Sequence, residues 1–92
     1  MIKLDLKNFR EIASLHENAC SLETLNDGDL LKAQLSDLGL DSLDVIDMVA
    51  EIERDYNVII SSESFDEKMY PAATEATVQK FLDVCNECLK PL

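Results

Sequence analysis

The sequence contains few of the residues that build turns and aromatic cores. Its 92 residues include two Gly, two Pro and no Trp, and aromatic residues make up only 5% of the chain. So little turn chemistry argues against a β fold of many strands. The first residues contain no apolar stretch of signal-peptide length. The three cysteines, an odd number, are therefore typical of reduced thiols in a cytosolic protein.

Positive charge is also scarce. The chain has 8 Lys and Arg against 19 Asp and Glu, which gives a formal net charge of −11. Because like charges repel, this balance argues against nucleic acid and anionic membranes as partners. No apolar run reaches transmembrane length. We therefore expect a monomeric cytoplasmic protein, without membrane insertion, that is steered toward basic surfaces of partner proteins.

The residues that are abundant are small and aliphatic apolar ones. Hydrophobic residues make up 47% of the sequence, which predicts one compact domain over residues 1–92. Apolar residues at helical spacing predict helices at about 6–20, 42–56 and 61–69, and a last one from an N-cap at Thr74 to about Leu89. The predicted fold class is all-α: a small four-helix bundle with a long first loop and a short third helix.

Two segments between these helices are harder to interpret. Residues 21–41 predict a long loop held to the core by leucines, with a turn at residues 26–29 and one helical turn around residues 33–37. Residues 58–60, Val-Ile-Ile, are the only strand-like run. Because this run is short and isolated, we expect it to fill the core between helices rather than to form a sheet.

The predicted helix at 42–56 has two apolar stripes. One is expected to face the core and contains Val45, Met48, Val49, Ile52 and Tyr56. The other lies nearly opposite, among acidic residues, and contains Leu43, Ile46 and Ala50. An apolar centre with a charged rim is typical of a docking surface. The alternative is that these are ordinary exposed apolar residues.

Asp41 and Ser42 stand side by side at the start of this helix, and both residue types are good N-caps. If Asp41 caps the helix, the Ser42 hydroxyl is left exposed in the first turn. That place suits a phosphodiester, because helix N-termini favour anions. Alternatively, Ser42 is itself a plain cap. The residues alone leave both interpretations open.

Residues 38–58, LGLDSLDVIDMVAEIERDYNV, resemble the attachment motif and recognition helix of the acyl carrier protein family. A weaker resemblance extends over the leucine-rich first loop, Ile60 with the polar residues after it, and Thr77-Val78-Gln79. The resemblance implies a four-helix fold and 4′-phosphopantetheine from coenzyme A on Ser42, within a motif that includes Asp41. It also implies a carrier and not an enzyme.

A carrier of this kind holds acyl intermediates as thioesters on its arm and presents them to partner enzymes of polyketide or fatty-acid-type biosynthesis. The implied partners are a phosphopantetheinyl transferase and acyl-loading, ketosynthase-type and other acyl-processing enzymes with basic docking surfaces. The family's docking positions fall on Leu43, Asp44, Ile46, Asp47, Ala50 and Glu53. The acyl cavity is expected to be lined by Leu31, Val49, Ile60 and Val78.

Two alternatives to an acyl carrier are a docking adaptor that is never modified and a peptidyl or aminoacyl carrier. Asp41 disfavours the second, because peptidyl carriers often have His before the serine. The chain also departs from the family pattern. Arg54 stands where many members carry an acid, and the segment 69–75, with Pro71 inside it, is longer than usual.

Enzyme and metal functions find little support in the sequence. His16 is the only histidine, predicted to lie mid-helix near the buried side, and no Gly-x-Ser-x-Gly elbow surrounds Ser42. Cys85 and Cys88 form a Cys-x-x-Cys near the end of a predicted helix, where packing explains them better than redox chemistry. We expect no metal site.

Overall fold

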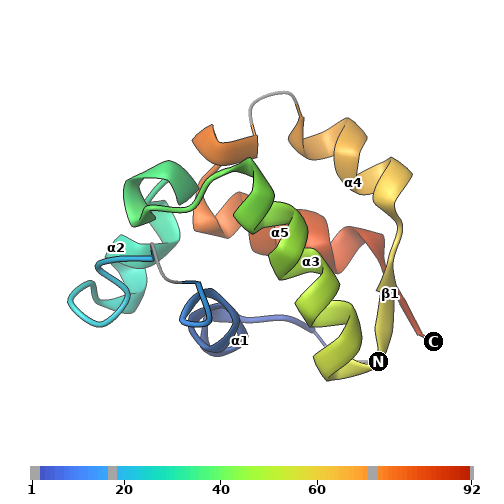
Figure 1. Ribbon diagram of the computed structural model, residues 1–92, viewed down its shortest axis with the longest axis horizontal. Coiled ribbons are helices and arrows are strands. Elements are labelled where there is room, and N and C mark those ends of the chain that lie inside the picture. The colour runs from blue at the N-terminus through green and yellow to red at the C-terminus, as the bar shows by residue number, and fades with distance from the viewer. Residues whose placement is uncertain (1–2, 17–18, 71–72, 92) are drawn as a thin grey trace.

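The computed structural model describes residues 3–16, 19–70 and 73–91. It is a small bundle of helices, as the sequence predicted (Figure 1). The α-helices are α1 (Leu6–Ala13), α2 (Asp27–Lys32), α3 (Ser42–Tyr56), α4 (Ser62–Met69) and α5 (Val78–Cys88). Two short 3-10 helices and two short strands complete it: η1 (Leu35–Leu38), η2 (Ala73–Glu75), β1 (Val58–Ile60) and β2 (Leu89–Pro91). None of the described helices is long and apolar enough to cross a membrane.

Three phenylalanines hold the helices together. Phe81 of α5 is fully buried and lies between Phe9 of α1 and Phe65 of α4. Both ring pairs meet edge to face, with centroids 5.9 and 6.1 Å apart, a geometry that aromatic rings prefer. One aromatic cluster thus joins helices that are distant in the sequence.

The bounds of α3 match the predicted helix at 42–56. Asp41 is the N-cap, and at the other end Asn57 adopts a left-handed conformation with φ of 56°. Asn is one of the few residues that tolerate this conformation, which commonly ends helices. Figure 1 shows α3 crossing in front of α5, with its first turn far from the two chain ends.

The first helix is shorter than predicted, because α1 ends at Ala13 and not near residue 20. Its start was predicted correctly: Asp5 and Asn8 form a capping box. Beyond Ala13, the chain is drawn away by tertiary contacts. The His16 ring reaches carboxylates of α3, and the Cys20 N–H donates to the carbonyl of Leu38 at 2.8 Å.

The first loop contains more helix than expected. Asn26 does not begin a turn but caps α2, accepting a hydrogen bond from the N–H of Asp29. The helical turn expected at residues 33–37 is η1, at Leu35–Leu38. Gly39 follows with φ of 79°, where a side chain would be strained. The leucines Leu30, Leu35, Leu38 and Leu40 are buried, as predicted for a loop held to the core.

The prediction for residues 58–60 was wrong in part. Val58 and Ile60 are buried, but β1 also forms a two-stranded antiparallel sheet with β2. Ile59 pairs with Lys90 at the centre of this sheet. The pairing was missed because its partner strand lies near the far end of the sequence, where the last helix was predicted to end at about Leu89.

The bounds of the last helix also differ from the prediction. Thr74 belongs to η2, and the N-cap of α5 is Thr77, whose Oγ1 accepts from the N–H of Lys80 at 3.1 Å. Pairing between the first loop and the segment before α5 fixes this start: the N–H of Val78 donates to the carbonyl of Ala33 at 2.9 Å. Pro71, noted in the sequence, lies outside the described residues.

Candidate functional site

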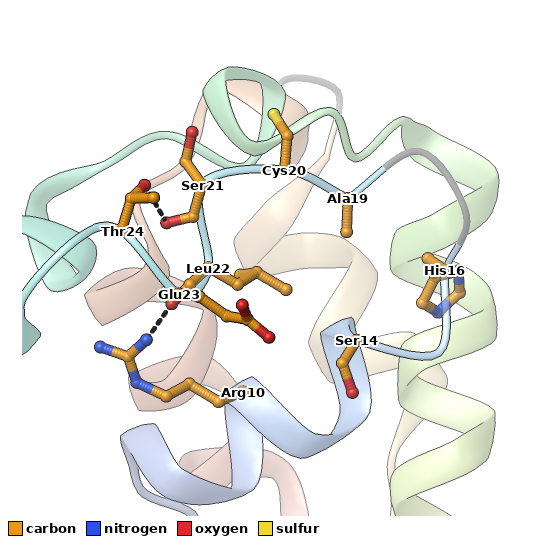
Figure 2. Close-up of a pocket in the computed structure, with 9 residues that line it drawn as sticks. All are labelled: Arg10, Ser14, His16, Ala19, Cys20, Ser21, Leu22, Glu23 and Thr24. Carbon is orange, nitrogen blue, oxygen red and sulfur yellow. Dashed lines mark hydrogen bonds between the residues drawn. The ribbon is translucent and has the colours of Figure 1, made fainter.

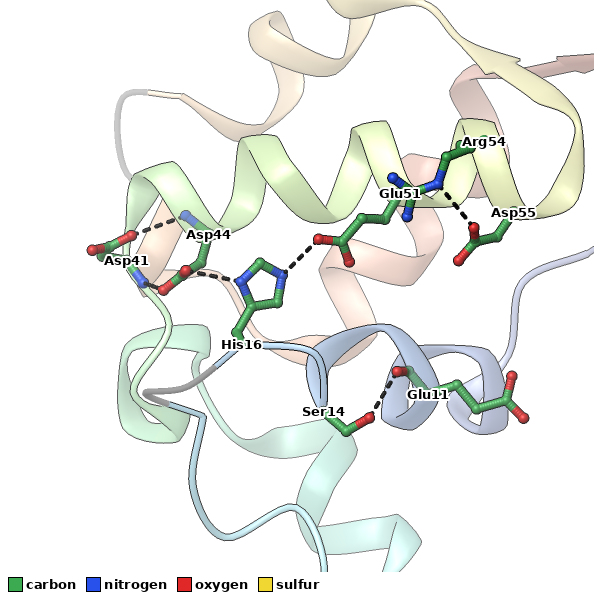
Figure 3. Close-up of polar contacts among 8 residues, drawn as sticks. All are labelled: Glu11, Ser14, His16, Asp41, Asp44, Glu51, Arg54 and Asp55. Carbon is green, nitrogen blue, oxygen red and sulfur yellow. Dashed lines mark hydrogen bonds and ion pairs between the residues drawn. The ribbon is translucent and has the colours of Figure 1, made fainter.

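Ser42 is the first residue of α3 and is exposed. The cap is made by its neighbours. Asp41 Oδ1 accepts from the N–H of Asp44, and Asp44 Oδ2 accepts from the N–H of Asp41, both at 2.9 Å. This reciprocal pair is a capping box with Asp in place of the usual Glu (Figure 3). Of the two interpretations that the sequence left open, the structure therefore supports the one in which Asp41 caps.

The segment before α3 explains how Ser42 is presented. Gly39 reverses the chain after η1, and the N–H of Leu40 then donates to the carbonyl of Leu35 at 3.1 Å. The side chain of Leu40 is buried, so this residue anchors the segment. The two residues that follow, Asp41 and Ser42, emerge at the surface.

His16 contacts two acidic side chains of α3 (Figure 3). Its Nδ1 lies 3.0 Å from Asp44 Oδ1, and its Nε2 lies 3.3 Å from Glu51 Oε1. These side chains are largely buried, with 9% of His16 and 17% and 16% of the two acids exposed. The predicted mid-helix position of His16 was wrong, since the residue lies beyond α1. Asp44 and Glu51 are seven residues apart, about two helical turns, so both lie on the face of α3 that His16 contacts.

Ser42 lies between two open hollows. One, of about 600 Å³, is on the η1 side and is lined by Ser36, Gly39, Leu40, Asp41, Ser42 and Thr74. The other, of about 490 Å³, runs between α3 and α4 and is lined by Ser42, Ile46, Ser62, Asp66 and Tyr70. A group attached to the Ser42 hydroxyl has free space on both sides.

A smaller pocket continues the second hollow inward between α3 and α4. Its volume is about 90 Å³, and its lining is Ile46, Val49, Ser62, Phe65, Asp66 and Tyr70. Of the four residues expected to line an acyl cavity, Val49 lies here. Ile60 and Val78 are instead packed in the core, and Leu31 is packed against it. Three of the four expected residues therefore do not line this pocket, which lies between α3 and α4.

The second apolar stripe of α3 is exposed. Leu43 and Ile46 are 68% and 54% exposed, among the largest exposures of large apolar residues in the described chain, and Ala50 is exposed as well. On the opposite side, Val45, Met48 and Ile52 are buried, whereas Val49 and Tyr56 are only partly buried and pack against the core. The two-stripe prediction is therefore confirmed as far as exposure is concerned.

The acids around this stripe differ in their contacts. Asp47 is exposed, whereas Asp44 is held by the capping box and by His16. Glu53 is half-buried, and its Oε2 accepts from the N–H of Ile60 at 3.0 Å. Arg54, the departure from the family pattern, is exposed and paired with Asp55 at 3.1 Å. Asp47 is thus the acid of the rim whose charge is most available to a partner.

Comparison with known families identifies the family of the chain. The model of a family described as the phosphopantetheine attachment site matches residues 13–78, which is more than two thirds of the 92 residues and includes all of α3. The chain belongs to this family. Comparisons with curated proteins and with solved structures gave no significant match.

Members of the phosphopantetheine attachment site family are carriers with covalently attached 4′-phosphopantetheine, and such carrier domains are not catalytic themselves. The chain is accordingly a phosphopantetheine carrier domain of the acyl carrier type, and the cofactor implied by the resemblance is confirmed.

The start of α3 in this carrier domain fits such a group. The helix N-terminus offers unpaired N–H groups and the positive end of the helix dipole, which favour a phosphate. The negative charge of Asp44 opposes it, but this carboxylate already accepts from the N–H of Asp41 and contacts His16. Ser42 is exposed, so its hydroxyl is accessible to a modifying enzyme.

The remaining candidates in the carrier domain have structural explanations. Cys85 and Cys88 are buried in α5, and burial is the largest cause that raises the pKa of each thiol. A low fraction of thiolate is the opposite of what redox or metal chemistry needs. Within residues 3–16, 19–70 and 73–91, no three side chains of the metal-ligating types gather into a site.

A further hollow, of about 430 Å³, lies under the loop after α1 (Figure 2). Arg10 lines it and donates to the carbonyls of Leu22 and Leu25, the latter at 3.0 Å, and its guanidinium pairs with Asp27 at 2.9 Å. These contacts join α1 to the loop and to α2. We therefore attribute the hollow to the way in which Arg10 anchors this loop.

Proposed function

We propose that Ser42 carries the 4′-phosphopantetheine arm and that the chain holds acyl intermediates on it as thioesters. The arm supplies a terminal thiol for the thioester; the protein supplies the attachment point and the surface that partners recognise. The observation that supports this proposal is that the cap of α3 and the exposed hydroxyl at its start belong to different residues. Asp41 and Asp44 complete the cap, which leaves the Ser42 hydroxyl exposed between two hollows.

We further propose that residues 1–92 form one carrier domain, monomeric and cytoplasmic, that serves polyketide or fatty-acid-type biosynthesis. Its partners are a phosphopantetheinyl transferase and acyl-loading, ketosynthase-type and other acyl-processing enzymes with basic docking surfaces. The proposed docking surface on α3 consists of Leu43, Asp44, Ile46, Asp47, Ala50 and Glu53. Its support is an exposed apolar stripe beside acids in a chain of net charge −11. Opposite charge on a partner would speed association.

The attachment test uses the purified chain, coenzyme A and a broad-specificity transferase, with intact mass spectrometry as the readout. Wild type should gain the mass of one phosphopantetheinyl group, and Ser42→Ala should gain none. Ser36→Ala is the matched control, because Ser36 is an exposed serine that lines the same hollow; it should be modified like wild type. An adduct on Ser42→Ala would place the arm on another residue, and no adduct on wild type would favour an adaptor that only docks. Either result would overturn the assignment.

A further inference from the structure

The groove between α3 and α4 is lined by Ser42, at the start of α3, and by Tyr70, the residue that follows α4. At its inner end it narrows into the pocket of about 90 Å³, where Ile46, Val49 and Phe65 supply apolar walls. Both parts share Ile46 and Tyr70. A group attached at Ser42 can therefore pass along one continuous hollow to Tyr70.

The Tyr70 hydroxyl is unusual among the polar groups of the chain. Its oxygen is buried from solvent and has no hydrogen-bond partner within the described residues. Buried polar groups are nearly always paired, and an unpaired one is destabilising. Burial, and secondarily the charge of Asp66, raises the pKa of the Tyr70 phenol. The hydroxyl therefore keeps its proton and can donate a hydrogen bond.

Tyr56 provides a contrast within the same chain. Its hydroxyl accepts from Asn8 Nδ2 at 3.1 Å and donates to Glu11 Oε2 at 3.4 Å, so its hydrogen-bonding groups are used. Tyr70 has the same half-buried ring but lacks such partners among the residues of the structure. What distinguishes Tyr70 is that it lines the hollow that starts at Ser42.

We propose that Tyr70 is a specificity-determining residue that donates a hydrogen bond to an oxygen of the carried acyl group. The cargo favoured by this groove is then an acyl chain that bears a ketone or hydroxyl, rather than a plain alkyl chain. An alkyl chain would contact the Tyr70 hydroxyl without forming a hydrogen bond. The carbon atoms of an oxygen-bearing chain would pack against the apolar walls, and its oxygen would accept a hydrogen bond from the hydroxyl. This inference rests on the proposed attachment at Ser42.

The arm itself contains amide carbonyls, which offer the same acceptor chemistry as an acyl oxygen. The experiment separates the two sources by comparing four forms of the protein, loaded enzymatically from coenzyme A and from its hexanoyl, 3-oxohexanoyl and 3-hydroxyhexanoyl thioesters. Each form is prepared for wild type, Tyr70→Phe and the control Tyr56→Phe. Intact mass first reports loading; failure to load overturns the attachment proposal, whereas the specificity proposal is decided by the loaded forms.

The readout is the rate at which hydroxylamine cleaves each thioester, divided by the rate for the same acyl group on free pantetheine. We expect wild type to protect the oxygen-bearing groups roughly fivefold more than hexanoyl, the ratio that one neutral hydrogen bond supplies. Tyr70→Phe should abolish this difference, and Tyr56→Phe should keep it. Equal protection of all three groups in wild type, or an unchanged difference in Tyr70→Phe, overturns the proposal.

A second measurement needs no variant. In wild type with ¹³Cζ-labelled tyrosine, the Tyr70 resonance should shift when 3-oxohexanoyl replaces hexanoyl, while the Tyr56 resonance stays in place. A full shift already present in the form that carries the arm without an acyl group would identify an arm carbonyl as the acceptor and overturn the acyl assignment.

Discussion

Replacement of Asp41 by Ala should destabilise the fold, whereas Ala in place of Ser42 should not. Asp41 Oδ1 accepts from the N–H of Asp44 at 2.9 Å, and its loss leaves a first-turn donor of α3 without this acceptor. Removal of such a cap costs about 1 kcal/mol, with a range of about 0.5–2 kcal/mol. In a domain of this size, about 1 kcal/mol lowers Tm by roughly 4–8 °C. Ser42 makes no cap bond and is exposed, so Ser42→Ala should stay within about 0.5 kcal/mol of wild type.

Thermal and urea unfolding of the unmodified protein, followed by far-ultraviolet circular dichroism, measures both changes. Thr77→Ala is the matched control, because Thr77 caps α5 through its own side chain and should cost as much as Asp41→Ala. If Ser42→Ala lowers stability as much as these two variants, Ser42 is a structural cap and the separation of cap and anchor is wrong.

Three further predictions concern surface charge, the histidine contact and the thiols. Asp47→Lys should slow modification by the transferase roughly threefold to tenfold at low salt and less at high salt. Asp83→Lys on α5 makes the same change of charge and is the control, and it should not slow modification. Equal effects of the two variants would argue against docking through α3. His16→Ala should cost about 1–3 kcal/mol in urea unfolding, because two largely buried carboxylates of α3 lose their partner. Native labelling with iodoacetamide should modify exposed Cys20 and spare buried Cys85. Burial raises the pKa of Cys85 above its ordinary 9.0, so as pH rises the thiol ionises in the unfolded state before it does in the folded state. The free energy of unfolding should therefore fall as pH rises above about 9. Equal labelling of Cys20 and Cys85, or a free energy of unfolding that does not change above a pH of about 9, would contradict these expectations.

The sequence predicted most accurately the part of the chain whose local and tertiary preferences agree. In α3, a capping residue, a helical period and a helix-ending Asn all favour the same bounds, and the structure has them. The exposure of Leu43 and Ile46 followed from the same period. The position of Ser42 at the start of this helix could therefore be predicted, although its separation from the cap needed the observed bonds of Asp41.

Errors arose where distant segments decide the conformation. The contact of His16 with α3 was not visible in the local pattern, and it accompanies the early end of α1. The β1–β2 pairing joins residues about thirty positions apart, a separation at which short strands carry no local signal. The role proposed for Tyr70 could not be anticipated either, because an unpaired hydroxyl is recognised only when its surroundings are known.

The two-stranded sheet of β1 and β2 also determines where a label or solid support can be attached to the molecule. It fixes residues 89–91 beside β1, the strand that follows α3 (Figure 1). Leu4 is held to α5 by two hydrogen bonds with Asn86, at 2.7 and 3.0 Å. Ser42 lies at the opposite end of α3, a helix of 15 residues and so about 22 Å long. A label or solid support joined near either end of the chain would thus leave the Ser42 end facing outward. This polarity makes the molecule suitable for measurements of partner binding on an immobilised surface.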